Sequence, residues 1–219
     1  MERESTNKTK RRDSFKKIKE SYLKSKLNFD KSKKGSIDKK ILSLINTINS
    51  LTDFYTTSSC SGRIVILETN ITTTKNKKND TKWVYSTHEL AKSKELIMKL
   101  KEHIELIETQ KNKSTPKLIF KMEPAILHVA SKSIEKAQKI LDIARHIGFK
   151  RSGIFATKKR IMIEIVNTER IDFPIYVKNK NLIINNEFLE MIIKEANEKL
   201  KLNWRKINTL EDKLKELLK

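Results

Sequence analysis

The segment Thr56-Thr57-Ser58-Ser59-Cys60-Ser61-Gly62-Arg63 carries five hydroxyls, one thiol and one guanidinium within eight residues. The guanidinium of Arg63 offers a planar fork of donors that suits a carboxylate or a phosphate. An apolar run, Ile64-Val65-Ile66-Leu67, follows at once. We therefore predict a polar loop that leads into a strand and either satisfies its own turn or holds a polar ligand.

Cys60 is the only cysteine of the chain, so no disulfide can form within it, which suits a reducing cytosol. A nucleophilic thiol needs a base, and His88 is the one candidate nearby in the sequence. The alternative is a small buried thiol, the usual state of a free cysteine. The four scattered histidines and the single cysteine have no metal-ligand spacing.

A basic cluster lies upstream of this segment, in Asp30-Lys31-Ser32-Lys33-Lys34-Gly35-Ser36-Ile37-Asp38. Asp30 is either a paired structural carboxylate or an acid–base group. Ser36 is a good N-cap for the helical pattern that follows. A helix N-terminus beside Lys33 and Lys34 is a candidate anion site.

Several common catalytic motifs are absent from the sequence. It has no glycine-rich dinucleotide loop and no Walker loop, and a serine nucleophile elbow would need glycines on both sides, where only Gly62 is present. Only two residues separate Cys60 from Arg63, too few to surround a phosphate as cysteine phosphatases do. The sequence therefore predicts neither an ordinary dinucleotide site nor a phosphatase site.

Hydrophobic periodicity predicts helices and short strands that position these side chains. The predicted helices cover residues 14–27, 37–51, 90–107, 134–147 and 186–218. The predicted strands cover residues 64–67, 82–88, 118–121, 126–130, 152–156, 160–166, 175–177 and 182–184. Ser133 and Gly148 begin and end the fourth helix. The pattern is typical of an α+β fold, and residues 1–13 are predicted to be a disordered basic arm.

Three side chains with rings on these strands each have two possible roles, one functional and one structural. Trp83 shares one face of its strand with Tyr85 and Thr87, and it either faces a ligand or packs in the core. His88 ends that strand and is either functional or a cap of the strand end. His128 lies within an apolar strand, where a satisfied structural role is the alternative to ligand binding.

The chain is strongly basic, with 48 Lys and Arg against 27 Asp and Glu and a net charge of +21. This excess predicts a nucleic-acid partner, because neutralising phosphates releases counterions. A general lysine bias is the alternative, since only nine of the 48 are arginine. The candidate phosphate contacts are Lys33, Lys34, residues 75–78 and Lys158-Lys159-Arg160.

The apolar runs indicate a cytoplasmic protein with no membrane partner. None approaches the ~20 residues of a membrane span. The N-terminal segment is charged and lacks the apolar core of a signal peptide. The oligomeric state is left open by the sequence.

Five motifs, taken in order, resemble the wybutosine-synthesis methyltransferase family, the third-step enzymes of wybutosine formation on tRNA, in their archaeal form. The motifs are residues 30–38, 56–63, 83–88, 120–129 and 148–154. The serine-cysteine block at residues 56–63 is the specific one.

The resemblance implies methylation, dependent on S-adenosylmethionine, of a ring nitrogen in a tricyclic wyosine-type guanosine derivative beside the anticodon of tRNA-Phe. It implies a mixed-sheet α+β fold in one methyltransferase domain, residues 1–219, and not a doubly wound methyltransferase.

On this resemblance we assign roles to the candidate residues. The ring nitrogen has a proton to lose, and Asp30 or His88 is expected to accept it. The residues expected to bind the cofactor are Ser59, Ser61, Arg63, Trp83 and His128. The residues expected to bind tRNA are Lys33, Lys34, Ser36 and Arg160.

Two other functions fit parts of the sequence. A non-catalytic RNA-binding module would use the same basic surface but would not bind S-adenosylmethionine specifically. A thiol-dependent hydrolase built on Cys60 would lose its activity on Cys60→Ser, whereas a methyltransferase would keep it.

Overall fold

The computed structural model describes residues 14–25, 38–70, 81–110, 115–180 and 184–216. Some of the predictions lie outside the described residues. They are the disordered arm 1–13, Asp30, Lys33, Lys34, Ser36, the lysine-rich residues 75–78 and most of the strand predicted at 182–184.

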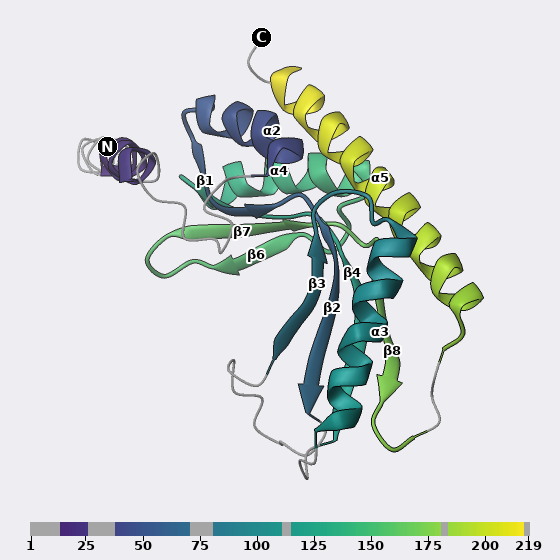
Figure 1. The fold of residues 1–219 in the computed structure, drawn as a ribbon. Helices are drawn as coiled ribbons and strands as arrows, with labels where there is room; N and C mark the ends of the chain where they lie inside the picture. Colours follow the sequence, from purple (N-terminus) through teal and green to yellow (C-terminus); the bar gives the residue numbers. More distant parts are fainter. Residues whose placement is uncertain (1–13, 26–37, 71–80, 111–114, 181–183, 217–219) are drawn as a thin grey trace, which may run out of the picture. The chain divides into compact units, whose positions relative to one another are not determined.

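The described residues form an α+β fold (Figure 1). The helices are residues 14–25, α2 (Lys39–Ser50), α3 (Ser93–Thr109), α4 (Ile134–Ile147) and α5 (Asn186–Glu216). The strands are β1 (Phe54–Cys60), β2 (Arg63–Asn70), β3 (Lys82–Thr87), β4 (Pro116–Glu123), β5 (Ile126–Ser131), β6 (Gly153–Ala156), β7 (Ile161–Val166) and β8 (Ile171–Val177). No described helix is both long enough and apolar enough to cross a membrane.

The chain divides into two compact units, each assembled from separate stretches. Unit 1 comprises residues 1–61, 125–168 and 204–219, and unit 2 comprises residues 62–124 and 169–203. Each unit holds one four-stranded sheet. The first sheet, in unit 1, has the order β1-β5-β7-β6, and the second sheet, in unit 2, has the order β3-β2-β4-β8.

In unit 1, helices cover one face of the first sheet. Leu127, Val129, Ile163 and Ile165 point from β5 and β7 into a core that they share with α2, α4 and the last part of α5. The strand alternation puts every second side chain of β5 and β7 on this face. The intervening side chains, among them His128 and Glu164, therefore lie on the opposite face.

The predicted limits of α4 are confirmed. Ser133 is the N-cap, and its hydroxyl accepts a hydrogen bond from the Lys136 backbone amide. Gly148 ends the helix in the left-handed region at φ 115°, where a residue with a Cβ would be strained.

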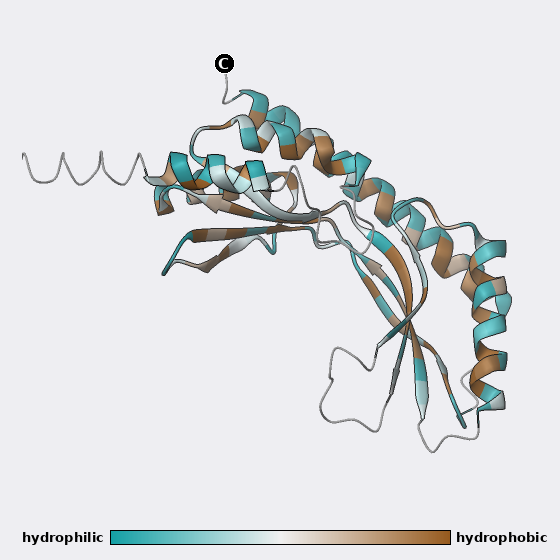
Figure 2. Ribbon diagram, turned by 60° about the vertical axis from the view of Figure 1, so that its left-hand side comes forward, coloured by the Kyte–Doolittle hydropathy of each residue, from teal (hydrophilic) through white to brown (hydrophobic). Residues whose placement is uncertain are grey.

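In unit 2, α3 and the first part of α5 bring apolar stripes to the second sheet. Leu96, Leu100 and Ile107 recur at helical spacing on α3 and are buried. The same stripes appear as brown bands along the two helices in Figure 2. The three consecutive residues Ile64, Val65 and Ile66 of β2 are also buried, so this strand is covered on both faces.

The fold class predicted from the sequence is confirmed, but two details of the prediction are wrong. The sheet is not mixed: all strand pairs among the described residues are antiparallel, and they form two sheets. A doubly wound fold needs parallel neighbours joined by crossover helices, and the described strands have none. The division into one domain stays a prediction.

The second correction concerns the polar segment. Residues 54–60 are strand β1 and not a loop, because their backbone groups pair with β5 from Phe54↔Ser131 to Cys60↔Ile126. β-Branched threonine suits a strand, and a bulge between Thr56 and Ser58 absorbs one extra residue. Only Ser61 and Gly62 separate β1 from β2, with Gly62 at φ 93°.

Asp53 ties the start of β1 to the start of α4. Its carboxylate pairs with Lys132 at 3.1 Å and with Lys136 at 3.0 Å. Burial alone would raise the pKa of Asp53, but the hydrogen bonds and charges of the two lysines together lower it. A carboxyl with a lowered pKa in the folded state stabilises the fold above its unfolded pKa, and this stabilisation disappears as the pH falls through the folded-state value.

We therefore expect Asp53→Asn to lower the free energy of unfolding at pH 7 and to lower it less at about pH 3, which is below the ordinary pKa of an aspartate in the unfolded chain. Urea unfolding of the variant and of the unsubstituted chain at both pH values measures this difference. Asp142→Asn is the matched control, because Asp142 is an exposed α4 carboxylate that accepts a bond from the Gln138 amide. A loss of stability that is equal at both pH values would contradict the assignment.

Candidate functional site

In unit 1, the end of β1 is joined to the start of α2 by buried hydrogen bonds. The backbone amide and the hydroxyl of Ser61 donate to Asp38 Oδ2, at 3.1 and 3.3 Å. Asp38 occupies the N-cap position of α2 but makes no side-chain cap bond to that helix. Its carboxylate is committed to Ser61 instead, and both residues are buried. Ser61 is therefore fixed in place just after β1.

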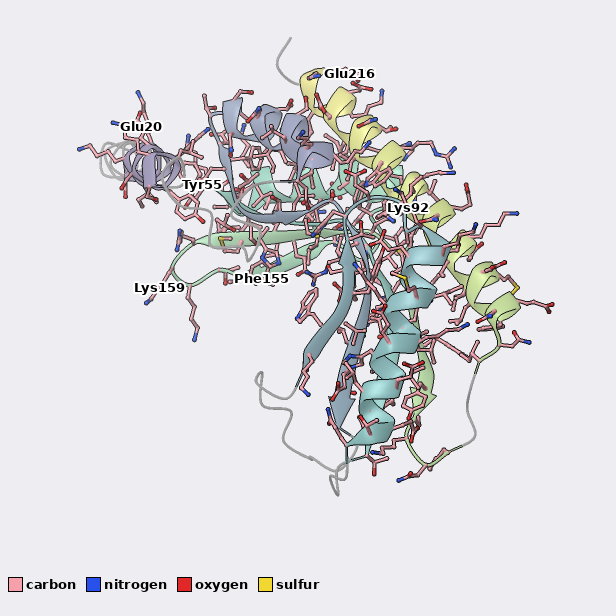
Figure 3. All side chains as sticks on the ribbon, viewed as in Figure 1. Glu20, Tyr55, Lys92, Phe155, Lys159 and Glu216 are labelled. Carbon is pink, nitrogen blue, oxygen red and sulfur yellow. The ribbon has the colours of Figure 1, made fainter. Side chains whose placement is uncertain are left out.

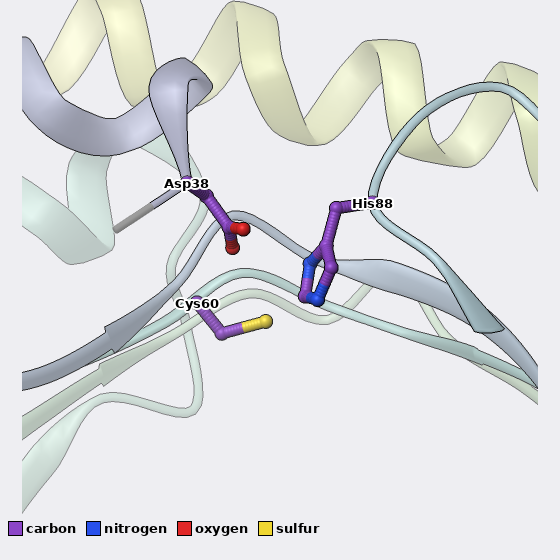
Figure 4. Close-up of side chains that lie close together, drawn as sticks. All are labelled: Asp38, Cys60 and His88. Carbon is purple, nitrogen blue, oxygen red and sulfur yellow. The ribbon is translucent and has the colours of Figure 1, made fainter. Parts of the chain in front are cut away.

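Cys60 lies beside this pair. Its Sγ and the nearest Asp38 carboxylate oxygen lie within 4.8 Å of each other. Figure 4 shows both side chains, together with His88, which belongs to unit 2. The neighbour of Cys60 in unit 1 is thus a buried carboxylate that already accepts two hydrogen bonds from Ser61.

In unit 2, Arg63 is held from two directions. Arg63 and Glu123 are paired residues of β2 and β4, and Arg63 Nε donates to Glu123 Oε2 at 2.5 Å. The guanidinium also lies over the ring of Trp83, 4.6 Å from its centroid. The terminal nitrogens of the guanidinium make no hydrogen bond to any described residue. Because stacking and an ion pair fix the plane, Arg63 presents these donors in a set direction.

His88 follows β3 in the same unit. Its Nδ1 lies 3.1 Å from the carbonyl oxygen of Gly62, the glycine just before β2. A hydrogen bond there fixes the orientation of the ring and favours the tautomer with a proton on Nδ1. Unit 2 thus gathers three of the predicted residues, Arg63, Trp83 and His88, around the first residues of β2.

His128 has two hydrogen-bond partners that the sequence did not indicate. Its Nδ1 lies 2.9 Å from Ser58 Oγ, and its Nε2 lies 2.8 Å from Glu164 Oε2. The three residues are direct neighbours across β1, β5 and β7. The available signal was the alternation in Ile161–Val166, where Glu164 is the single charged residue of an apolar strand.

Arg160 joins an aromatic group on unit 1. Its Nη1 donates to the Tyr55 hydroxyl at 3.2 Å, and this hydrogen bond raises the pKa of Arg160. The rings of Phe15 and Tyr22, from the helix 14–25, pack on Tyr55 with centroids 5.6 and 5.2 Å away. Arg160 therefore has a structural partner, and its contact with tRNA stays a prediction.

The predicted site residues that the structure describes fall in both units. Ser59, Ser61, His128 and Arg160 belong to unit 1, whereas Arg63, Trp83 and His88 belong to unit 2. Within unit 1, Ser61 is bound to Asp38 and His128 to Ser58 and Glu164, so these two predicted cofactor ligands have separate partners. Their roles in binding stay predictions.

The family model Methyltransferase TYW3 matches residues 10–216 of the chain. The chain belongs to the TYW3 methyltransferase family. The match runs through both units and includes Asp38, Ser61, Arg63, His88 and His128, so the TYW3 family accounts for the resemblance seen in the five sequence motifs.

Named TYW3-type relatives come from archaea and vertebrates. The chain is 35% identical over 188 residues to the Methanocaldococcus jannaschii protein named tRNA(Phe) 7-((3-amino-3-carboxypropyl)-4-demethylwyosine(37)-N(4))-methyltransferase, covering 85% of this chain and 91% of the relative. It is 30% identical over 190 residues to the Xenopus laevis tRNA wybutosine-synthesizing protein 3 homolog, covering 86% of this chain and 71% of the relative.

A solved structure has the same fold as this TYW3-family chain. The PH1069 protein from Pyrococcus horikoshii superposes with a TM-score of 0.74 at 30% identity, covering 91% of this chain and 93% of the other. A crystal structure of a hypothetical protein from Aeropyrum pernix superposes with a TM-score of 0.65 at 25% identity, covering 82% of this chain and 98% of the other.

Proposed function

We propose that this chain methylates a ring nitrogen of the tricyclic wyosine-type guanosine derivative next to the anticodon of tRNA-Phe, with S-adenosylmethionine as the methyl donor. The observation that carries the proposal is the TYW3 match over residues 10–216. The archaeal relative's printed name supports a finer choice of substrate, the 4-demethylwyosine form that carries the 3-amino-3-carboxypropyl group and is methylated at N(4).

The donor set of unit 2 fits one end of this cofactor. S-adenosylmethionine supplies an electrophilic methyl group on a sulfonium and carries a carboxylate on its amino-acid tail. Arg63 presents the terminal nitrogens of a guanidinium that Glu123 and Trp83 hold in a fixed plane. A carboxylate is the partner that such a fork binds best. We assign Arg63 to the carboxylate and Trp83 to support of the guanidinium.

The remaining task of the chain is to position the base and take its proton. Alignment of the reacting nitrogen supplies most of the acceleration in a methyl transfer, because the reacting atoms must meet in line. As the nitrogen forms its new bond to the methyl carbon, the bond from that carbon to sulfur breaks and the sulfur keeps the electron pair, and the nitrogen loses a proton to a base. His88, whose ring is oriented by the Gly62 carbonyl, is one candidate and Asp30 is the other.

The setting of the reaction is also part of the proposal. We assign the protein to the cytoplasm, since a chain with a single cysteine suits a reducing compartment. We assign it to the archaeal type, supported by the 91% coverage of the archaeal relative. The net charge of +21 supports direct binding of the tRNA backbone.

Methyl transfer to precursor tRNA tests the proposal. We expect the purified chain, mixed with tRNA-Phe carrying the demethylated tricycle and isotope-labelled S-adenosylmethionine, to produce a nucleoside heavier by one labelled methyl group. tRNA binding should weaken as the salt concentration rises, because counterions are released on binding. A chain that binds the tRNA but neither binds S-adenosylmethionine nor transfers the label would support the RNA-binding module instead. Precursor lacking the 3-amino-3-carboxypropyl group, methylated equally well, would overturn the finer choice of substrate.

A further inference from the structure

One face of the first sheet in unit 1 carries the core, and the other carries a row of polar and aromatic side chains. Ser58, His128 and Glu164 are adjacent across β1, β5 and β7. The side chains of His128 and Glu164 are 31% and 38% exposed. Antiparallel sheets commonly leave one polar face to water, and these side chains are partly exposed on such a face.

Phe155 adds an exposed aromatic ring to this row. It is 56% exposed, although phenylalanine is among the residues most often buried. Its ring centroid lies 5.0 Å from that of His128, with a tilt of 48° between the planes. The His128 ring therefore supports one side of Phe155 and leaves the phenyl group standing on the sheet surface.

The hydrogen bonds of His128 fix the plane of this supporting ring. Ser58 holds Nδ1 at 2.9 Å and Glu164 holds Nε2 at 2.8 Å. A hydroxyl and a carboxylate each retain further lone pairs when they bond to an imidazole. The edge of the row therefore offers hydrogen-bond acceptors beside a flat aromatic surface.

Positive charge lies on the same hairpin as the aromatic ring. Lys158 and Lys159 occupy the turn between β6 and β7 and are exposed. Figure 3 shows Phe155 on β6 and Lys159 at the turn of the same hairpin. Proteins that bind single-stranded nucleic acid commonly combine exposed aromatic rings with nearby cations. The bases stack on the rings, and the phosphates lie near the lysines.

We propose that this surface, which we call the Phe155 face (Ser58, His128, Phe155, Lys158, Lys159 and Glu164), binds a single-stranded segment of RNA. One base stacks on Phe155, its exocyclic amino group donates to Glu164 or Ser58, and the adjoining phosphates contact the two lysines. The net charge of +21 favours a polyanion over a neutral ligand or a protein partner poor in acidic residues. That the RNA is the anticodon loop of tRNA-Phe rests on the proposed function.

Fluorescence anisotropy with a labelled, unmodified anticodon stem-loop of tRNA-Phe tests this surface. Phe155→Ala should weaken binding at least about fivefold, the lower end of what one stacked base contributes. Phe155→Trp keeps a stacking surface and should bind as tightly as the unsubstituted chain. Ile134→Ala is the matched control, since Ile134 is a 52% exposed apolar residue of the same unit on α4, and should leave binding unchanged.

The salt dependence of stem-loop binding separates the contribution of base stacking on Phe155 from that of the lysine charges. Lys158→Gln combined with Lys159→Gln should flatten the slope of log K against log salt by about 0.7 for each phosphate of the single strand that is no longer neutralised. Phe155→Ala should weaken binding with no change of slope. Equal binding by Phe155→Ala and the unsubstituted chain would overturn the proposal, and so would equal weakening by Phe155→Ala and Ile134→Ala.

A methyl-transfer assay on the same proteins distinguishes this proposal from the proposed function. If the unsubstituted chain methylates precursor tRNA and Phe155→Ala binds the stem-loop normally, the Phe155 face is wrong and the enzyme assignment stands. If the unsubstituted chain transfers no methyl group, but Phe155→Ala binds the stem-loop more weakly than it does, the enzyme assignment is wrong and the RNA-binding role of the Phe155 face is supported.

Discussion

Replacing Arg63 with methionine is expected to lower kcat/KM for methyl transfer about 100-fold, which corresponds to about 2.7 kcal/mol. The reason is that the fixed guanidinium is assigned to the cofactor's carboxylate, and a hydrogen-bonded charge pair of this kind is among the stronger single interactions. The loss should appear mainly in KM for S-adenosylmethionine. Steady-state kinetics with saturating tRNA and varied cofactor measures it.

Three further variants sharpen the test of Arg63. Arg63→Lys keeps the charge but loses the planar fork, so it should restore only part of the affinity. Glu123→Gln keeps the size of the side chain but removes the charge that holds Nε, so it should raise KM less than Arg63→Met. Arg170→Met is the control, because Arg170 is a half-exposed arginine of the same unit paired with Asp172. An unchanged KM in Arg63→Met would rule out the assignment.

Replacing Asp38 with alanine is expected to lower the free energy of unfolding of unit 1 by about 3 kcal/mol. The substitution leaves the buried amide and hydroxyl of Ser61 without their acceptor. An unmet buried donor costs about 1–3 kcal/mol, and the hydroxyl can rotate to find another partner more easily than the amide can. Asp38→Asn keeps an acceptor oxygen and should cost markedly less.

The two tryptophans allow this loss to be assigned to one unit. Trp204 belongs to unit 1 and Trp83 to unit 2, and the chain has no others. In a Trp83→Phe background, urea unfolding followed by tryptophan fluorescence therefore reports on unit 1. Asp38→Ala and Asp38→Asn should differ by at least about 1 kcal/mol in this measurement. Equal stabilities for the two variants would show that the acceptor oxygen is not what Asp38 contributes.

Local sequence signals predicted the helices of this fold well. Ser133 and Gly148 mark the limits of α4 by chemistry that acts within a few residues, and the long apolar stripe predicted at 186–218 is α5. The strand β1 was mistaken for a loop because serine and threonine are common in turns as well as in strands. What makes residues 54–60 a strand is pairing with β5, about 70 residues away, which no local pattern contains.

In the candidate site, too, local sequence patterns did not reveal contacts between residues far apart in the chain. Arg63 and Trp83 were chosen for their chemistry, but the ion pair with Glu123 follows from the register of β2 with β4. Ser58 and Glu164 were missed because their connection to His128 spans three strands. The sequence placed Asp38 near a helix start, yet nothing local indicated that its carboxylate would bond to Ser61, 23 residues later. Side-chain types were therefore predictable, and their partners were not.

The order in which the ribosome produces this chain has a consequence for how it folds. Each unit is closed by a segment that is synthesised late: unit 1 needs residues 204–219, and unit 2 needs residues 169–203. β1 emerges long before β5 and β7, and β2, β3 and β4 emerge before β8 covers the edge of β4. Domains that fold during synthesis usually complete their N-terminal part first. Here neither sheet can be finished until most of the chain is made, so the polar strand β1 spends much of synthesis without its partner.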